Sequence, residues 1–229
     1  MNRGALALGL GATVLVATGA FVAFRSGQPA GERASATSSP RDPGDQLIPQ
    51  RSNGSPAAPV VVYELSDFQC PYCRLFWEET MPVLEKEYVA TGKIRIVFLN
   101  YPIAQLHPNA PAAHTFAMCA AAQDRFWPVH DLLFRYQARW EHEVDPSGTF
   151  RALADSARLD RQKLAACLAS RPHQPVIEAE TRDAMRAGIG GTPAFVINGG
   201  IMTGAQPIDI WRPILDSILR GRREDQPED

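Results

Sequence analysis

The chain has 229 residues, of which 45% are hydrophobic, and a formal net charge of -2 at pH 7. This length suits one large domain or two small ones, and the hydrophobic content is ordinary for a globular protein. Because Lys and Arg nearly balance Asp and Glu, and no basic stripe is interleaved with aromatic residues, the sequence lacks the electrostatic pattern of a nucleic-acid-binding protein. We therefore expect no nucleic-acid partner.

The first 25 residues contain a long uncharged run, from residue 5 to residue 24. An apolar helix of about 20 residues can span a membrane, whereas the apolar part of a secretory signal covers about 7 to 15 residues. The length therefore favours a retained membrane anchor, and a signal cleaved at the small residues 17–19 or 34–36 is the alternative. Either route predicts an extracytoplasmic location, in the periplasm or on the outer face of the cell membrane.

Two segments without apolar periodicity flank the part that is expected to fold. Residues 26–58 are rich in Pro, Ser and Gly, which is typical of a flexible linker. Residues 220–229, RGRREDQPED, have the composition of a disordered charged tail. The predicted domain therefore spans residues 59–219, and the linker would tether it to the membrane if the N-terminal segment is retained.

The predicted domain opens with a strand, a helix and a second strand. The apolar, β-branched run VVVYEL at residues 60–65 predicts a buried strand. A helix is expected to begin at Pro71, because proline suits the first helical turn and apolar residues then recur at helical spacing. Pro82 should kink this helix. The run IRIVFL at residues 94–99 predicts the second strand, parallel to the first.

A long helical block separates this unit from the last strands. Residues 108–188 carry helical patterns that no strand pattern interrupts. Two short apolar runs then follow, at residues 194–197 and 200–203, and the Asn-Gly pair between them is a strong signal for a β-hairpin. A closing helix completes the domain. The predicted fold class is α/β, with a helical insertion between the two halves of one sheet.

Cys70 and Cys73 stand two residues apart in the stretch SDFQCPYC. A zinc site usually needs four ligands in paired clusters, and Cys119 and Cys167 are isolated, so we expect no metal; a two-thiolate copper(I) site is the alternative. A purely structural bridge is also disfavoured, because it would close a tiny loop and restrict the unfolded chain very little.

A redox role explains the position of the pair at a helix N-terminus. Free backbone N–H groups and the helix dipole favour a negative charge there, so the pKa of Cys70 should fall. Cys73, one turn deeper, should be shielded and stay protonated. We predict that Cys70 is the exposed sulfur that joins a substrate in a mixed disulfide, and that Cys73 resolves it. Pro71 and Tyr72 complete the catalytic motif. No cofactor is expected.

The order of these features resembles the DsbA family of thioredoxin-fold thiol-disulfide oxidoreductases, in particular its BdbD-like branch. SDFQCPYC after a strand, the helical insertion, GIGGTPAFVING and the final helix carry the resemblance over residues 59–219. It implies a thioredoxin-like fold and a cis bond between Thr192 and Pro193. The Thr192 backbone would then lie beside Cys70 and bind an extended substrate by strand-like pairing.

The resemblance also matches Glu64, six residues before Cys70, to the family's buried acid beneath the active site. A carboxyl group inside an apolar strand should have a raised pKa and could relay the proton of Cys73. The alternative is that Glu64 faces solvent. Asp67 more readily caps or turns the backbone.

The remaining cysteines and the histidines are given structural roles. In an oxidising compartment, Cys119 and Cys167 are expected to form a stabilising disulfide; buried free thiols and a second redox pair are the alternatives. Packing or surface roles are favoured over catalysis for three histidines. These are His107, His114 and His130.

The combined prediction is an exported dithiol oxidant that introduces disulfides into reduced exported proteins and is recycled by a membrane redox partner. The Pro-Tyr dipeptide departs from the Pro-His pair of many strong oxidants in the family, so electron flow in the opposite direction is kept as an alternative. The alternatives are a disulfide reductase or isomerase, a glutathione-dependent isomerase or transferase, and a copper(I)-binding chaperone-like module.

Overall fold

The computed structural model describes residues 46–224. The predicted anchor and the greater part of the predicted linker therefore lie outside the described residues. Within residues 46–224, no helix has the length and the apolar character that are needed to cross a membrane.

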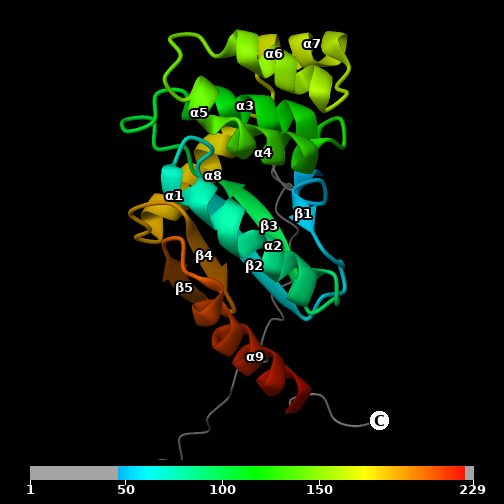
Figure 1. The fold of residues 1–229 in the computed structure, drawn as a ribbon, viewed down its shortest axis with the longest axis vertical. Coiled ribbons are helices and arrows are strands. Elements are labelled where there is room, and N and C mark those ends of the chain that lie inside the picture. Colours follow the sequence, from blue (N-terminus) through cyan, green and yellow to red (C-terminus); the bar gives the residue numbers. More distant parts are fainter. Residues whose placement is uncertain (1–45, 225–229) are drawn as a thin grey trace, which may run out of the picture. The chain divides into compact units, whose positions relative to one another are not determined.

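One mixed five-stranded sheet lies at the centre, in the order β1-β3-β2-β4-β5 (Figure 1). The strands are β1 (Ser52–Asn53), β2 (Val60–Ser66), β3 (Ile94–Asn100), β4 (Ala194–Ile197) and β5 (Gly200–Thr203). As predicted, β2 and β3 are parallel, and β4 and β5 form an antiparallel hairpin whose first strand pairs with β2. The predicted thioredoxin-like fold is confirmed.

The parallel pairing of β2 and β3 brings two loops together. Ser66 at the end of β2 is opposite Asn100 at the end of β3, so both chains leave the sheet at the same edge. The residues after β2 carry the cysteine pair, and the residues after β3 lead into the helical insertion. Side chains from residues 67–70 and from residues 101–109 can therefore meet.

The helix after β2 contains two wide turns. It consists of α1 (Pro71–Leu75), the π-helical turn η2 (Phe76–Thr80), α2 (Met81–Leu84) and the π-helical turn η3 (Glu85–Val89). Pro82 lies in the first turn of α2, directly after η2. A proline ring crowds the carbonyl four residues before it, which here belongs to η2, and the wider turn relieves this crowding. At the position where a kink was predicted for Pro82, the structure has a π-helical turn directly before the proline.

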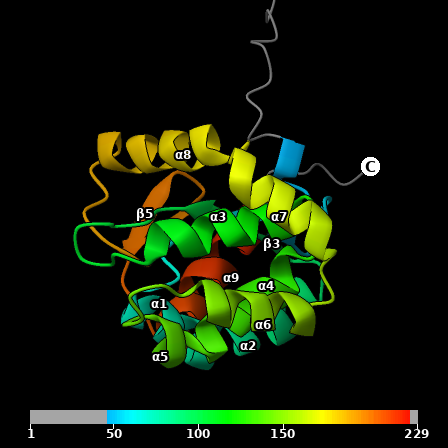
Figure 2. The same cartoon turned by 90° about the horizontal axis from the view of Figure 1, so that it is seen from above.

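The insertion lies over the edge of the sheet at which α1 begins (Figure 1), and Figure 2 shows its helices from above. An aromatic core joins it to the sheet, with Phe68 and Phe98 stacked at 4.9 Å between ring centroids and Phe126 5.1 Å from Phe98. The helices are α3 (Ala110–Ala121), α4 (Phe126–Arg135), α5 (Gln137–Trp140), α6 (Ser147–Ser156), α7 (Arg161–Ser170) and α8 (Gln174–Arg186).

The folded part extends beyond both predicted boundaries. At the N-terminal side, β1 pairs with β3, and the fully buried Arg51 binds the Glu180 carboxylate at 2.8 Å and the Phe98 carbonyl at 3.0 Å. At the C-terminal side, helix α9 (Ile208–Glu224) runs into the predicted tail, and Arg222 donates to Asn198 at 3.0 Å. The boundaries predicted at residues 58 and 220 are therefore wrong. Polar contacts of this kind leave no apolar periodicity in the sequence, so the sequence pattern did not indicate them.

Candidate active site

The two thiols lie at the start of α1. Cys70 immediately precedes Pro71, the first residue of the helix, and Cys73 lies inside its first turn. The Cys70 Sγ donates to the Thr192 carbonyl at 3.3 Å, and the Cys73 Sγ accepts from the Asp67 amide at 3.4 Å. Both cysteines are free thiols in this structure. Cys70 was predicted to be the exposed sulfur, but only 4% of its surface is exposed. Cys73, at 0%, is the more buried of the two.

The two thiols have opposite electrostatic environments. Hydrogen bonding from Cys73 is the main cause that lowers the pKa of Cys70 to about 6. Burial opposes this shift, and the Thr192 side chain and the backbone amides of Cys73 and Tyr72 add to it. Burial is the main cause that raises the pKa of Cys73, and the nearby Cys70 raises it further. These environments favour a thiolate at Cys70, which then no longer donates to the Thr192 carbonyl, and a protonated thiol at Cys73.

The loop before β4 covers the pair from the opposite side. The Thr192–Pro193 bond is cis, and the Thr192 carbonyl is the group that Cys70 contacts. Tyr72 is 63% exposed, so it stands at the surface between the two cysteines. The structure thus brings together Cys70, Cys73 and Thr192, which lie up to 122 residues apart in the sequence.

Glu64 lies inside the domain, on β2 between Phe98 of β3 and Phe195 of β4. Its exposed fraction is 1%, so the alternative in which it faces solvent is wrong. Burial is the main cause that raises its pKa, and its Oε2 atom has no hydrogen-bond partner among the described residues. A carboxyl group in such a place favours its neutral, protonated form.

This burial predicts a specific dependence of stability on pH. Above about pH 4.5 the unfolded chain ionises this carboxyl, whereas folded Glu64 keeps its proton to higher pH. The folded state then binds more protons than the unfolded state, so stability should fall as pH rises through this window. Glu64→Gln removes the titrating carboxyl group. As pH rises through this window, the free energy of unfolding of the variant should increase relative to that of wild type, by about 1.4 kcal/mol for each unit by which folding raises the pKa of Glu64.

Urea unfolding of both proteins at a series of pH values measures this difference. Glu79→Gln, on the solvent side of the active-site helix, is the matched control for exchanging a glutamate. A constant difference between Glu64→Gln and wild type from pH 4 to pH 8 would contradict a buried neutral acid.

Sequence reasoning missed one contact of the active-site loop. Asp67 turns the backbone as predicted, since its Oδ1 accepts from the Gln69 amide at 2.8 Å. Its Oδ2, however, binds the Nδ1 of His107 at 2.8 Å and the amide of Ile103 at 2.8 Å. Nothing in the local pattern around His107 indicates this contact. The available signal is the parallel pairing of the two strands, which places their following loops side by side.

The other residues singled out in the sequence have structural positions. Cys119 on α3 and Cys167 on α7 form a disulfide. His114 is fully buried and its Nδ1 binds the Asn100 Oδ1 at 2.8 Å, while burial lowers its pKa to about 4. His130 packs within the aromatic core, 5.0 Å from Phe134 between ring centroids.

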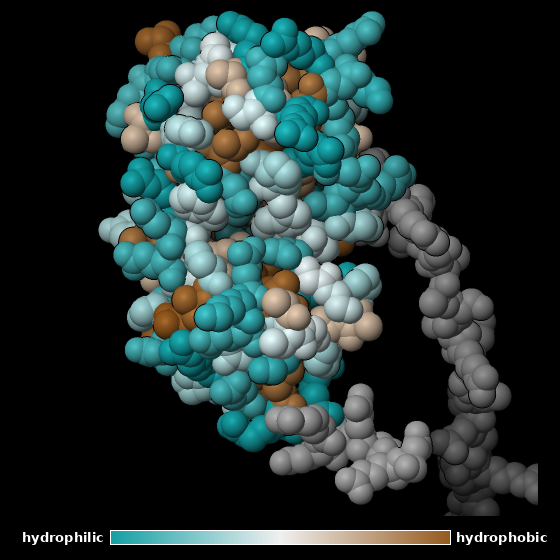
Figure 3. All heavy atoms as spheres, turned by 45° about the vertical axis from the view of Figure 1, so that its right-hand side comes forward, coloured by the Kyte–Doolittle hydropathy of each residue, from teal (hydrophilic) through white to brown (hydrophobic). Residues whose placement is uncertain are grey.

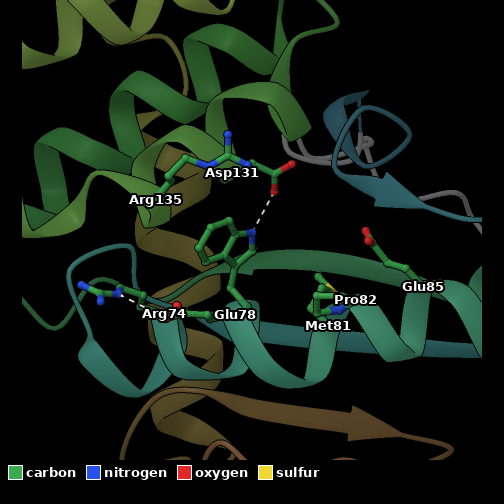
Figure 4. Close-up of a pocket in the computed structure, with 8 residues that line it drawn as sticks. Arg74, Glu78, Met81, Pro82, Glu85, Asp131 and Arg135 are labelled. Carbon is green, nitrogen blue, oxygen red and sulfur yellow. Dashed lines mark hydrogen bonds and ion pairs between the residues drawn. The ribbon is translucent and has the colours of Figure 1, made fainter.

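A groove of about 470 Å³ runs along the active-site helix. Asp131 and Arg135 of α4 line one side, and Arg74 and Glu78 line the other (Figure 4). The Trp77 indole donates to Asp131 at 3.0 Å and so ties the helix to the insertion.

The surface of the molecule is mixed in character. On the face that Figure 3 draws, hydrophobic residues gather in small groups between hydrophilic ones. Near the cysteine pair, Tyr72, Leu75 and Leu106 are exposed large apolar side chains.

A thioredoxin-like sheet with a Cys-Pro-Tyr-Cys pair at a helix N-terminus and a helical insertion defines a dithiol protein of the DsbA-like class. The family model described as Thioredoxin matches residues 47–217. The chain belongs to this family.

Several relatives that the chain matches over most of their length are named for disulfide bond formation. The "Probable disulfide bond formation protein D" of Bacillus cereus is 25% identical over 186 residues, which cover 79% of this chain and 85% of that protein. The crystal structure of oxidised BdbD from Bacillus subtilis has a TM-score of 0.68 at 23% identity and covers 75% of this chain and 93% of the other. This structural likeness shows the shared fold.

A further match is to one part of a longer protein. The "Na(+)/H(+) antiporter NhaA 3" of Salinispora tropica is 34% identical over 146 residues, which are 64% of this chain and 21% of that protein. The chain thus spans about a fifth of the length of this curated relative.

Proposed function

We propose that this chain is an exported protein thiol-disulfide oxidoreductase that acts as a dithiol oxidant on extracytoplasmic polypeptides. The observation that carries the proposal is the placement of the two thiols: Cys70 lies directly before the first turn of α1, 3.3 Å from the Thr192 carbonyl, and Cys73 is fully buried. In these places the pKa of Cys70 is lowered to about 6 and the pKa of Cys73 is raised. A stabilised thiolate in the reduced protein favours reduction of the Cys70–Cys73 disulfide, which makes the disulfide form an oxidant. The names of the full-length relatives support the same chemistry.

The proposed reaction starts from the Cys70–Cys73 disulfide. A substrate thiolate attacks the Cys70 Sγ, the bond to Cys73 breaks, and a mixed disulfide forms. A second substrate thiolate then attacks the substrate sulfur of this mixed disulfide and displaces Cys70 as a thiolate, for which its low pKa makes it a good leaving group. The substrate loses two electrons and gains a disulfide, and the site gains the two electrons and ends as a dithiol.

Two neighbouring groups would assist these steps. Cys73 leaves as a buried thiolate and needs a proton, and Glu64, whose burial favours its protonated form, is the proposed source. The backbone of Thr192, whose carbonyl lies 3.3 Å from the Cys70 Sγ, is the proposed pairing site for an extended substrate. Backbone pairing would accept many sequences, as a general oxidant requires.

The proposed location is outside the cytoplasm, with the N-terminal segment as a membrane anchor. The Cys119–Cys167 disulfide supports this, because structural disulfides persist in oxidising compartments. After each turnover the Cys70–Cys73 dithiol must lose two electrons, so we propose a membrane redox partner that reoxidises it.

The reduction potential of the pair tests the direction of electron flow. Equilibration of the purified protein with a glutathione buffer should give a potential above about -200 mV, in the range of known oxidants. The disulfide form should also oxidise a reduced peptide that contains two cysteines. A potential near about -270 mV, together with faster reduction than formation of substrate disulfides, would support the reductase alternative instead.

A further inference from the structure

The carboxylate of Asp67 is buried next to the cysteine pair. Its side chain is 0% exposed, and both oxygens are bound: Oδ1 by the Gln69 amide, and Oδ2 by the Ile103 amide and the His107 ring, each at 2.8 Å. A buried carboxylate is costly unless a positive charge or several hydrogen bonds compensate it. Of these three partners, only His107 can carry a positive charge.

Asp67 is also the backbone link between the two sulfurs. Its amide donates to the Cys73 Sγ at 3.4 Å, and its carbonyl accepts from the Cys70 amide at 3.0 Å. Whatever holds the Asp67 side chain therefore holds the loop that positions both cysteines. The His107 ring, 40 residues away in the sequence, is one of the groups that hold it.

His107 is in turn held next to the loop that carries Cys70. It lines a groove of about 420 Å³ together with Gln69 and Pro71, the two residues that flank Cys70 in the sequence. The loop that carries His107 is tied to this place by Asn109, whose amide donates to the Gln69 Oε1 at 2.7 Å. Only 16% of the His107 side chain is exposed, so water screens its charge incompletely.

We propose that His107, held by Asp67, is a positioning residue of the thiol site, and that its imidazolium form stabilises the Cys70 thiolate and makes the Cys70–Cys73 disulfide more oxidising. This proposal rests on the proposed function of the pair in thiol exchange. It gives the site a positive charge that the Cys-Pro-Tyr-Cys motif does not contain. It departs from the packing or surface role that the sequence favours for His107.

The groups that face His107 favour its charged form. The hydrogen bond to Asp67 is the main cause that raises the pKa of His107; burial opposes it, and the charges of Cys70 and Glu141 raise the pKa further. His142 and Glu143 line the same groove. Because coupling between two sites is reciprocal, a histidine that stabilises the thiolate must itself be stabilised by the thiolate. The pKa of His107 should therefore be higher in the reduced protein than in the oxidised protein.

An NMR titration of the wild-type protein tests this reciprocity without any substitution. The His107 ring signal, assigned by its loss in His107→Asn, is followed against pH in the dithiol and the disulfide forms. We expect the proton affinity of His107 to be about three- to tenfold higher in the dithiol form. His142, with 88% of its side chain exposed, is the internal comparison for changes that affect all histidine ring signals. Equal His107 pKa values in the two forms would overturn the proposal.

Variants test the consequence for the thiols. His107→Asn keeps a donor for Asp67 but removes the charge, so the proton affinity of the Cys70 thiolate should rise about tenfold. At a pH well above the Cys70 pKa of both proteins, the equilibrium with glutathione should shift about tenfold toward the disulfide form, which corresponds to a potential lower by about 30 mV. His107→Lys restores a positive charge, so it should return both the Cys70 proton affinity and the glutathione equilibrium most of the way to their wild-type values. A variant that only lost packing at residue 107 would not show this recovery. His142→Asn is the matched control and should leave both unchanged.

Unaltered Cys70 titration in a folded His107→Asn protein would also overturn the proposal. These readouts follow thiol ionisation and glutathione equilibrium, and neither requires a protein substrate. If the protein fails to oxidise peptides while His107 still titrates differently in its two redox forms, the oxidant role falls and the positioning role of His107 stands.

Discussion

Cys70→Ser is expected to reduce thiol exchange to the uncatalysed background. The only other free sulfur among the described residues, Cys73, is 0% exposed and has a pKa raised mainly by burial. It therefore offers substrates neither access nor a thiolate. The rate at which a two-cysteine peptide is oxidised, measured at pH 7 with a glutathione buffer as the electron acceptor, checks this. Residual activity above background would show that Cys70 is not the attacked sulfur.

Cys73→Ser should have a different effect, because it leaves Cys70 reactive but removes the thiol that attacks the mixed disulfide when a substrate disulfide is reduced. Incubation with a disulfide-bonded substrate should then give a stable covalent complex, visible as a band of summed mass on a non-reducing gel. Cys73→Ala is the informative partner variant. Hydrogen bonding from Cys73 is the main cause of the low Cys70 pKa, so alanine should raise this pKa more than serine does.

Removal of the disulfide between Cys119 and Cys167 is expected to cost about 4 kcal/mol of unfolding free energy. The bridge joins residues 48 apart, and the chain-entropy model gives a stabilisation of this size for such a loop. Its local effect should be large on α7, in which Leu164 is the one residue that the helix buries. Urea unfolding of the double variant Cys119→Ala/Cys167→Ala measures the loss, and hydrogen exchange should show α7 opening before the sheet.

The wild-type protein unfolded in the presence of a strong reductant is the matched control, because it loses the same bridge without any substitution. Its midpoint should approach that of the double variant. Peptide oxidation at low denaturant should be unaffected in the variant, since Cys70 and Cys73 lie in another helix. A double variant as stable as wild type would show that helix packing alone holds α7 on α3.

Local patterns were sufficient for the elements that carry the thiols. The β-branched run of β2, the proline that begins α1 and the Asn-Gly pair between β4 and β5 are each encoded within a few neighbouring residues. The spacing of Cys70 and Cys73 within a helix start is local too, so their redox role is predicted from sequence. The boundaries at residues 58 and 220 were wrong because polar contacts, such as the one between Arg51 and Glu180, have no periodic trace.

The sequence by itself determined the fold class, the order of the elements and the chemical type of the site, because these depend on patterns that repeat over short distances. The resemblance already implied that the Thr192 backbone, 122 residues away, lies beside Cys70. Only the tertiary structure shows that the His107 ring, 40 residues from Asp67, binds the loop that carries the thiols. A single hydrogen bond between distant side chains involves only two residues, so it produces no repeating pattern in the sequence. It becomes visible when the parallel pairing of β2 and β3 places the two loops at one edge of the sheet.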